Sequence, residues 1–536
     1  MEIITKNLSG VASRFVPRLL TQACRDPNAP FFGCFDRNWW HYKIRDFPSI
    51  ILQQGGYAAH LAGQLEDFSD LRNGLDSLAA ASVRFWSERA LSHGAFEEYY
   101  PWEQGYPPLA FSTLSAAKLC LHGVGETSAA MPAFRAAAKQ LAQRFEPRAA
   151  NQQVAGLAAA ACLRKIDPNL ISAGDFESLA QRTLSLQHSE GWFMEYDGPD
   201  LGYLTVTLDC LWDLYDQTGD FKFLDAAGRA FAFMEWFITS PPHAAGQHNA
   251  RNTDYLVPYG LTRFLAEGED WKKRAERVLR ILYNNTDSPE HFFSAVDDRY
   301  VSHYIGHSVL RAISQLQGES PRTETNSTQT VPLVREIQSN YFSGSGHWRA
   351  GQSLLVSGKK GGIFSAGSDD DTCIADFGWI VQRAKKEYVS HWWSPDWQVE
   401  ARDNRISVRG KLYPHVEHLS TPAKHAILRL TSFFLGRHLI AWLKSILIFK
   451  AGGEHLSFHR EIFLESAELI HVEDEIGGLL PGDKLCRAPR ASKRHVASAD
   501  SFHPEDFVLA QGCHISETRD QTDNVHRIKT SYQFPA

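Results

Sequence analysis

Apolar residues recur at helical spacing through the first 320 residues of the chain. Between residues 70 and 91, for example, Leu71, Leu75, Leu78 and Phe85 fall on one face of a helix. The same spacing predicts further helices, and the full set covers residues 7–24, 47–62, 70–91, 109–121, 130–145, 151–164, 174–187, 204–217, 221–238, 255–266, 271–283 and 301–317.

These helices alternate between two kinds. One kind follows a polar, aromatic loop such as residues 195–203 and is rich in small residues, whereas the other is conventionally amphipathic. The first kind recurs about every 50 residues, which is typical of one helical hairpin per repeat. Polar residues gather before the same helix of each hairpin, as a shared central cleft requires. We therefore expect a closed (α/α)6 toroid over residues 1–320 rather than an open solenoid, with helix 7–24 closing the ring.

The pattern changes beyond a polar linker at residues 320–330. Short alternating runs predict strands near residues 352–358, 362–367, 386–393, 398–402, 405–409, 456–463 and 469–474. They indicate an antiparallel β-sandwich over residues 331–480. Residues 430–449 are ambiguous between helix and buried strands. Residues 481–536 are interpreted as a polar, basic, loop-like extension that could belong to the β domain.

The richest apolar run, residues 426–449, is interrupted by Arg429, Arg437, His438 and Lys444. A membrane span needs about 20 nearly uninterrupted apolar residues, so we interpret this run as core. The N-terminus lacks the basic and apolar regions of a signal peptide, which predicts a cytoplasmic location. The 8 Cys form no C-x-x-C pair, so neither a disulfide scaffold nor a structural zinc site is indicated.

Composition narrows the class of protein. With 536 residues, 43% hydrophobic and 22% charged, the chain is long enough for two or three folded domains. The net charge of -7 comes from well-mixed signs, which does not favour a nucleic-acid partner. The 14 Trp and 17 Tyr suit contacts with flat sugar faces, although aromatic residues also fill large cores.

The loops before the inner helices hold the residues that could carry chemistry. Asp, Asn and Thr at such places are first of all helix caps, as Asp200, Asn252 and Asp297 could be. Capping needs one polar residue per loop, however, and residues 247–255 and 297–304 each hold several His, Asn, Arg and Tyr. Asn151 and Gln152 precede the inner helix of the third repeat.

Two reactions fit this set of residues. Abstracting the proton α to a uronate carboxylate requires donors that neutralise the carboxylate, together with a base and an acid, commonly His and Tyr. Glycoside hydrolysis requires two carboxylates, which Glu97 or Glu98 with Glu195 or Asp197 could supply. The sequence does not determine their separation, so both reactions remain open.

A helical toroid followed by an antiparallel β domain resembles the heparinase II/III-like superfamily, which includes alginate and heparin lyases. The resemblance implies an Asn-His step and a Tyr on the toroid, with a His from the β domain, around the scissile bond. Here the nearest match is His248-Asn249 in reversed order, with Tyr255 or Tyr304 as the acid and His347 as the β-domain His.

We assign catalysis to His248, Tyr255, His303 and Tyr304. The residues expected to bind substrate are Glu98, Tyr100, Glu103, Glu195, Asp197, Tyr203, Asn249, Arg251, Asn252, Arg299 and His347.

The chain departs from the family pattern at its metal segment. Many such proteins carry His-x-His-x-Asp, whereas this chain has the run Asp369 to Asp371, which is more typical of a solvated turn than of a cation site. We expect no metal and no cofactor.

The leading hypothesis is β-elimination of an acidic, uronate-containing polysaccharide in intracellular polysaccharide, O-antigen or capsule metabolism. The alternatives are a glycoside hydrolase, a C5-epimerase, and a non-catalytic glycan-binding assembly protein. The expected partner is a polysaccharide or oligosaccharide, with no nucleic acid and no membrane span.

Overall fold

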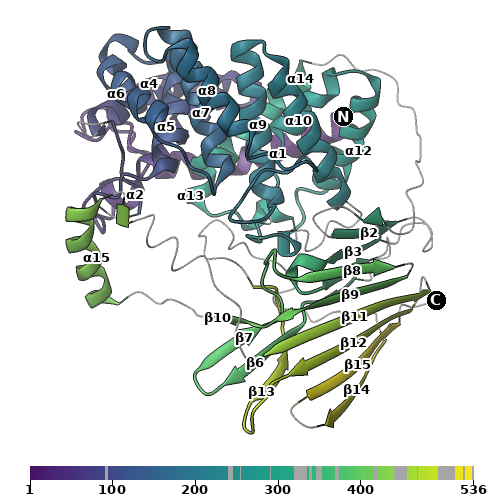
Figure 1. Ribbon diagram of the computed structural model, residues 1–536. Coiled ribbons are helices and arrows are strands. Elements are labelled where there is room, and N and C mark those ends of the chain that lie inside the picture. The colour runs from purple at the N-terminus through teal and green to yellow at the C-terminus, as the bar shows by residue number, and fades with distance from the viewer. Residues whose placement is uncertain are drawn as a thin grey trace.

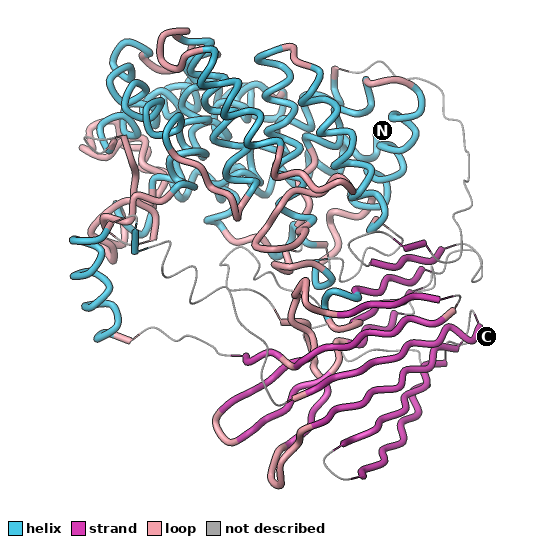
Figure 2. Tube along the Cα trace, viewed as in Figure 1, coloured by secondary structure: helices cyan, strands magenta, loops and turns pink. Residues whose placement is uncertain are grey.

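The computed structural model has a helical part and a part made of β-sheets, which lie one above the other in Figure 1. It describes residues 1–90, 94–99, 101–238, 246–253, 255–289, 291–318, 335–336, 341–345, 353–367, 373–402, 404–415, 421–436, 438–439, 456–466, 469–492, 514–522 and 525–533. Figure 2 shows that the helices precede almost all of the strands, with one later helix standing apart. The predicted limits of the two domains stay a prediction, because residues 319–334 lie outside the described residues.

Among the described residues, six helices form a closed inner ring in which each helix contacts the next and the last contacts the first. They are α3 (Gln54–Gln64), α5 (Tyr106–Leu121), α7 (Ala150–Ile166), α9 (Leu201–Thr218), α11 (Tyr259–Arg263) and α14 (Gly306–Gln317). The outer helices are α1 (Glu2–Gln22), α4 (Arg72–Arg89), α6 (Thr127–Gln143), α8 (Ala173–Leu184), α10 (Phe221–Met234) and α12 (Glu269–Tyr283). Helix α1 contacts α12, α14 and α3, so it closes the ring. The predicted toroid is confirmed.

Small side chains allow the inner helices to approach one another closely. In α7 every residue from Ala150 to Leu163 is buried, although an isolated amphipathic helix would bury only one face. A Cβ added at Gly156 would lie 2.3 Å from the hydroxyl oxygen of Tyr106 on α5, so glycine is required at that contact. The outer helices instead bury one stripe each, which explains the alternation of helix types along the chain.

Shorter segments complete the helical part. They include α2 (Arg37–Trp40), the 3-10 turns η1 (Ile50–Gln53) and η4 (Gly246–His248), α13 (Asp298–Tyr300) and the π-turn η7 (Val301–Ile305). Within the described residues, none of the helices combines the length and apolar character that crossing a bilayer requires.

The strands form antiparallel sheets. One sheet has the order β1-β2-β3-β4-β5, with bounds Arg335–Glu336, Tyr341–Ser345, Ser353–Ser357, Ile363–Gly367 and Cys373–Asp376. A second has the order β10-β7-β6-β13, with bounds Tyr413–His415, Lys386–Val389, Trp379–Arg383 and Lys484–Arg487. The third has the order β14-β15-β12-β11-β9-β8, with bounds His514–Thr522, Val525–Gln533, Leu469–Gly477, Ser457–Ser466, Arg405–Lys411 and Gln398–Arg402.

The sheets share one hydrophobic core. It contains Val356 from the first sheet, Val381 from the second and Ile462 from the third. Side chains from facing sheets therefore fill one apolar layer, and the predicted antiparallel sandwich is confirmed.

Two predictions about the C-terminal half were wrong. Residues 481–536 are not loop-like throughout, because they supply β13, β14 and β15, and β15 pairs with β12 along its whole length. In β15 the buried positions are Ile528, Thr530 and Tyr532, and Lys529 and Ser531 lie between them. Because one of the buried residues is a threonine and the residues between them are polar, the sequence shows little of the alternating apolar pattern of a strand.

The apolar run 426–449 was interpreted as core, yet most of its described part belongs to an exposed helix, α15 (Pro422–Leu435), whereas Leu439 beyond that helix is buried. The side chains of Ile427, Leu430 and Phe434 are 64%, 64% and 74% exposed. Only Ser432 is buried in this helix. Residues 440–450 lie outside the described residues.

A buried ionic network joins the sheets. Arg460 on β11 is fully buried and donates hydrogen bonds to Asp474 on β12 at 2.7 and 2.8 Å and to Asp376 on β5 at 3.2 Å. The Tyr532 hydroxyl donates to Asp376 at 2.6 Å. Burial opposes ionisation of Asp376, but Arg460 and Arg487 together hold the pKa of its carboxyl well below the usual range.

We expect Arg460→Leu to lower the free energy of unfolding by about 3–5 kcal/mol, because two buried carboxylates would lose their cation. Urea denaturation followed by tryptophan fluorescence measures this change. The control is Lys529→Ala, which removes an exposed cation 2.7 Å from Glu473 and should leave the midpoint nearly unchanged. Equal effects of both substitutions would contradict a structural role for the buried network.

Candidate active site

The loops that precede the inner helices lie at the end of the toroid that faces the sheets. The Trp393 indole donates to the backbone oxygen of Asp197 at 3.2 Å, and Ser365 on β4 hydrogen-bonds His248 at 2.8 Å. Both contacts join a toroid loop to the β domain, as the arrangement in Figure 1 indicates. The predicted site residues are therefore found between the two parts of the protein.

Three of the four predicted catalytic residues form one cluster. The hydroxyl oxygens of Tyr255 and Tyr304 are 2.5 Å apart, and the rings of His303 and Tyr304 are 4.6 Å apart. Tyr300 contacts all three rings, with centroid distances of 5.8 to 6.3 Å. All of these side chains are at least nine-tenths buried. The cluster combines an imidazole with phenols, the usual groups for proton transfer.

The local backbone positions His303. It lies in the π-turn η7 and has φ -100° and ψ -146°, which interrupts the helical path between α13 and α14. π-turns of this kind are frequent at functional sites. Nδ1 of His303 is buried and has no hydrogen-bond partner in the part of the chain that the structure describes. This nitrogen therefore takes part in no hydrogen bond within the described residues.

Burial sets the protonation states of this cluster. Burial, assisted by the charge of Arg299, lowers the pKa of His303 well below its usual value. Burial and the neighbouring phenols raise the pKa of Tyr304 well above its usual value. At neutral pH the imidazole is uncharged and can accept a proton, whereas the phenol holds its proton and can donate it.

An arginine connects this cluster to the acidic loop before α9. The Arg251 guanidinium lies 4.2 Å from the ring centroid of Tyr203 and 4.4 Å from that of Tyr196, and it donates to Glu195 at 3.1 Å. The ring centroids of Tyr203 and Tyr304 are in turn 6.3 Å apart. A continuous set of contacts therefore joins the loops of repeats four, five and six.

Glu195 is committed to internal contacts. One carboxylate oxygen accepts the backbone N–H of Asn151 at 2.8 Å, and the other accepts the hydrogen bond of Arg251. Burial raises its pKa to about 8, although Arg251 acts in the opposite direction. Asp197 in the same loop has φ +76° and is exposed, so it faces solvent.

Asn151 was named among the candidate loop residues, but the sequence analysis assigned it neither a catalytic nor a substrate-binding role. It stands in the first turn of α7 and is 1% exposed, and both polar atoms of its side chain lack hydrogen-bond partners among the described residues. Burying an amide without hydrogen-bond partners lowers the stability of the fold by about 1–3 kcal/mol. Such groups are uncommon in folded proteins, and one explanation is that the amide binds a ligand. Its place at the start of an inner helix was the signal that could have identified it.

The loop of residues 246–253 docks onto the β domain. Lys360 is fully buried and donates to the backbone oxygens of Gln247 and Asn249, each at 2.6 Å, and to Oδ1 of Asn252. Asn252 has φ +57°, a left-handed conformation that asparagine tolerates better than most residues. The many His and Asn residues of this loop therefore have a second explanation besides catalysis, because several of them form hydrogen bonds with the β domain.

His248 takes part in this docking. It is fully buried, its Nε2 lies 2.8 Å from Ser365 Oγ, and its backbone oxygen accepts the Ser357 hydroxyl at 2.9 Å. Burial and the charge of Lys360 lower the pKa of His248 to about 3. We interpret His248 as an interface residue, while the Tyr255, His303 and Tyr304 cluster holds the groups suited to proton transfer.

A second histidine lies on the β side of the interface. Nδ1 of His391 accepts the backbone N–H of Ser492 at 2.6 Å, whereas its buried Nε2 has no partner among the described residues. Burial and nearby Lys360 lower its pKa to about 3. The sequence offered His347 as the β-domain histidine, but His347 lies outside the described residues.

The other predicted residues hold the loop before α5. Glu98 accepts a hydrogen bond from Arg299 at 3.2 Å, and Glu103 accepts the backbone N–H of Tyr99 at 2.7 Å. Both carboxylates are buried. Tyr100 lies outside the described residues, as does the run of residues 369–371. In the described ranges, no group of three or more His, Cys, Asp or Glu could hold a metal ion.

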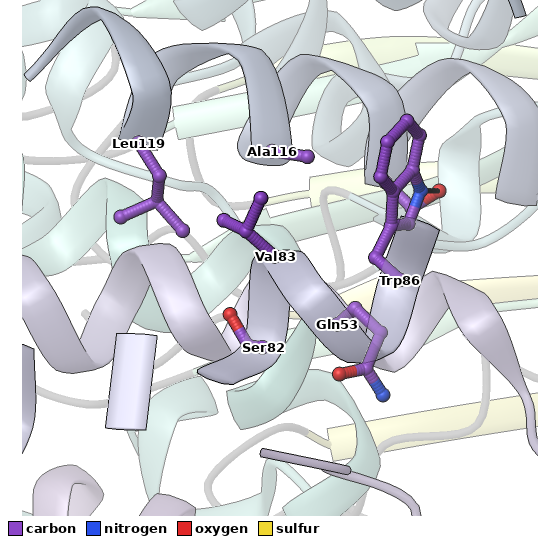
Figure 3. A pocket seen from close by; sticks show the side chains of 7 residues that line it. Gln53, Ser82, Val83, Trp86, Ala116 and Leu119 are labelled. Carbon is purple, nitrogen blue, oxygen red and sulfur yellow. Dashed lines mark hydrogen bonds between the residues drawn. The ribbon is translucent and has the colours of Figure 1, made fainter. Parts of the chain in front are cut away.

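Figure 3 shows a small internal gap between α4 and α5. It is lined by Gln53, Ser82, Val83, Trp86, Ser112, Ala116 and Leu119. The Trp86 indole donates to Ser112 Oγ at 2.8 Å across this region. The gap is a feature of packing between an inner and an outer helix, and none of the candidate site residues lines it.

No family model and no curated protein matches the chain. Several solved structures are similar to it in part. A chondroitin AC lyase from Streptomyces coelicolor A3 matches over 99% of this chain and 77% of its own, with 10% identity and a TM-score of 0.46. A heparinase III matches over 90% of this chain and 76% of its own, with 10% identity and a TM-score of 0.44. An unsaturated glucuronyl hydrolase specific for heparin matches over 59% of this chain and 98% of its own, with 11% identity and a TM-score of 0.39.

Identities of 10% to 11% leave the activity of this chain to be inferred from its own side chains.

We expect Lys360→Met to weaken the attachment of the β domain, because three buried oxygens would lose a donor, each at a cost of about 1–3 kcal/mol. Thermal unfolding should begin at a lower temperature, and limited proteolysis should separate the two parts sooner. Lys386→Met, at the exposed first residue of β7, is the matched control. An unchanged unfolding curve for Lys360→Met would contradict the docking role.

The lowered pKa of His248 also predicts a dependence on pH. A histidine with a folded-state pKa of about 3 contributes stability above its ordinary pKa, and that stability is lost as pH falls from about 6.5 towards 3. In this window His248→Gln should flatten the slope of unfolding free energy against pH by up to about 1.4 kcal/mol per pH unit. Parallel slopes for the two proteins, measured by urea unfolding at pH 7 and pH 5, would contradict the buried, neutral state.

Proposed function

We propose that the protein is a carbohydrate-active enzyme that cleaves a uronate-containing polysaccharide by β-elimination. The observation that carries the proposal is the pairing of a buried, uncharged His303, whose Nδ1 lacks a partner among the described residues, with the hydrogen-bonded phenols of Tyr255 and Tyr304. This arrangement suits proton abstraction by an imidazole and proton donation by a phenol.

The uronate carboxylate must be neutralised before its α proton becomes acidic enough to remove. The unpartnered amide of Asn151 supplies a hydrogen-bond donor for this purpose, and the adjacent Arg251 supplies positive charge. Glu195 holds Arg251 in place and is therefore a positioning residue.

The bond changes of the proposed reaction balance without a cofactor. His303 takes the C5 proton, the electrons of that bond form a C4–C5 double bond, and the C4–O bond breaks. The leaving oxygen receives a proton from Tyr255 or Tyr304. His391 on the β side, with its unpartnered Nε2, is a second candidate base.

Hydrolysis by paired carboxylates has less support. Glu97 accepts the backbone N–H of Trp102 at 2.7 Å, Glu98 is paired with Arg299, and Glu195 is paired with Arg251. Groups of the protein itself thus occupy these three carboxylates, whereas the acid and the base of a hydrolase must face the glycosidic bond. An epimerase shares the proton abstraction and remains the nearest alternative. Intracellular polysaccharide metabolism stays a prediction of the sequence.

The proposal is tested by supplying alginate, heparan sulfate, chondroitin and hyaluronan and recording the ultraviolet absorbance of the unsaturated uronate. We expect product with at least one polymer. We expect His303→Gln to lower kcat by roughly 10²–10⁴-fold, the usual contribution of a general base, while its unfolding curve is retained. His41→Gln, at an exposed histidine of the helical part, is the control.

Other outcomes identify the alternatives. New reducing ends without absorbance would indicate a hydrolase, and solvent deuterium incorporated into an uncleaved polymer would indicate an epimerase. Binding without chemical change would indicate a glycan-binding protein. Full activity in His303→Gln would remove this residue from the mechanism and leave His391 as the candidate base.

A further inference from the structure

Helix α15 presents an apolar stripe that nothing in the described structure covers. Ile427, Leu430 and Phe434 recur at helical spacing and are 64%, 64% and 74% exposed. The helix touches the toroid on another side, where the ring of Phe433 lies 5.1 Å from that of Trp102. Figures 1 and 2 show α15 beside the helical part, near α2 and apart from the sheets.

This exposure is concentrated. Among the described residues, five of the fourteen large hydrophobic side chains that are exposed lie on this one helix. Folded monomers rarely present contiguous apolar surface unless it binds a partner or a membrane. Because the stripe does not pack on the toroid, the hydrophobic effect favours its burial against something else.

The stretch of sequence that contains α15 is opposite in charge to the whole chain. The whole chain has a net charge of -7, yet residues 418–453 contain no Asp or Glu and five basic residues. These are Lys424, Arg429, Arg437, Lys444 and Lys450. At 100° per residue, Lys424 and Arg429 fall on the two flanks of the stripe formed by Ile427, Leu430 and Phe434.

We propose that α15 is an interfacial helix that binds the surface of an anionic membrane. Its apolar stripe would lie at the level of the acyl chains, while the basic side chain of Lys424 meets lipid phosphates. The ion pair between Arg429 and Asp46 anchors the helix to the toroid. The helix has 14 residues, about 21 Å in length, which is shorter than a bilayer core of about 30 Å, so it lies on the surface and does not span it.

An acidic protein partner is the competing occupant. Lysine is depleted at the centre of protein interfaces, whereas lysine and arginine beside Phe and Leu are typical of membrane-surface helices. The interleaving of basic and large apolar residues in this stretch therefore favours lipid. This inference does not depend on the proposed reaction, because α15 contributes no residue to the candidate active site.

Flotation of the full-length protein with vesicles tests the proposal. Vesicles of phosphatidylcholine with phosphatidylglycerol should carry the protein, and vesicles of phosphatidylcholine alone should carry much less. Added salt should reduce binding, because it screens the cations. The double variant Ile427→Ser, Phe434→Ser should bind roughly tenfold or more weakly, since two buried apolar side chains are lost. The matched control is Leu71→Ser with Phe221→Ser, at side chains that are 51% and 70% exposed on the toroid.

Circular dichroism should show equal unfolding midpoints for the two double variants, because all four positions are exposed. Lys424→Glu should weaken binding to the anionic vesicles only. The proposal is overturned if neither vesicle carries the protein, or if both double variants bind equally. It is also overturned if sedimentation shows a dimer that Ile427→Ser, Phe434→Ser dissociates, since the stripe would then bind a second copy.

Discussion

The buried ammonium group of Lys360 ties the β domain to the toroid. It donates to three oxygens of one toroid loop, at residues 247, 249 and 252, and no water can replace it there because the group is fully buried. Withdrawing the lysine would leave those oxygens desolvated and unpaired, which makes the contact specific as well as strong. Together with the hydrogen bonds of His248 to Ser365 and of Trp393 to Asp197, this interaction joins loops of the toroid to the β domain.

Burial at that junction also sets the chemistry. Removal from water disfavours the charged form of every titratable group, so histidines become neutral, phenols keep their protons and the pKa of Glu195 rises to about 8. Arg251 stays charged because Glu195 and two tyrosine rings surround it. The neutral imidazoles and the protonated phenols thus follow from one physical cause.

Periodicity predicted most of the fold. The inner and outer helices differ in residue size and in the width of their apolar faces, and both properties can be recognised from a short stretch of sequence. The strands of residues 484–533 were missed because polar and charged side chains occupy most of their positions. Helix α15 was assigned to the core because its residues are apolar, yet hydrophobicity along a sequence does not tell whether another surface covers them.

The candidate site was predicted in part. Loop composition led to Tyr255, His303 and Tyr304, which the structure brings together, and to Arg251, which connects two of the loops. It also led to His248, Asn249 and Asn252, whose polar groups largely serve the contact with the β domain. Asn151 was a candidate without an assigned role, because only the packed structure shows that its amide is buried with no partner among the described residues.

The sequence by itself determined the ring of helical hairpins, the change to antiparallel strands and the loops where polar residues gather. Each of these follows from side-chain spacing over a few turns or a few strand residues. Only the tertiary structure decided which polar residues face one another and which dock two domains, because those roles depend on contacts between residues more than 100 positions apart, such as His248 with Ser365. Burial, the quantity that sets their pKa values, likewise belongs to the assembled fold and not to any single segment.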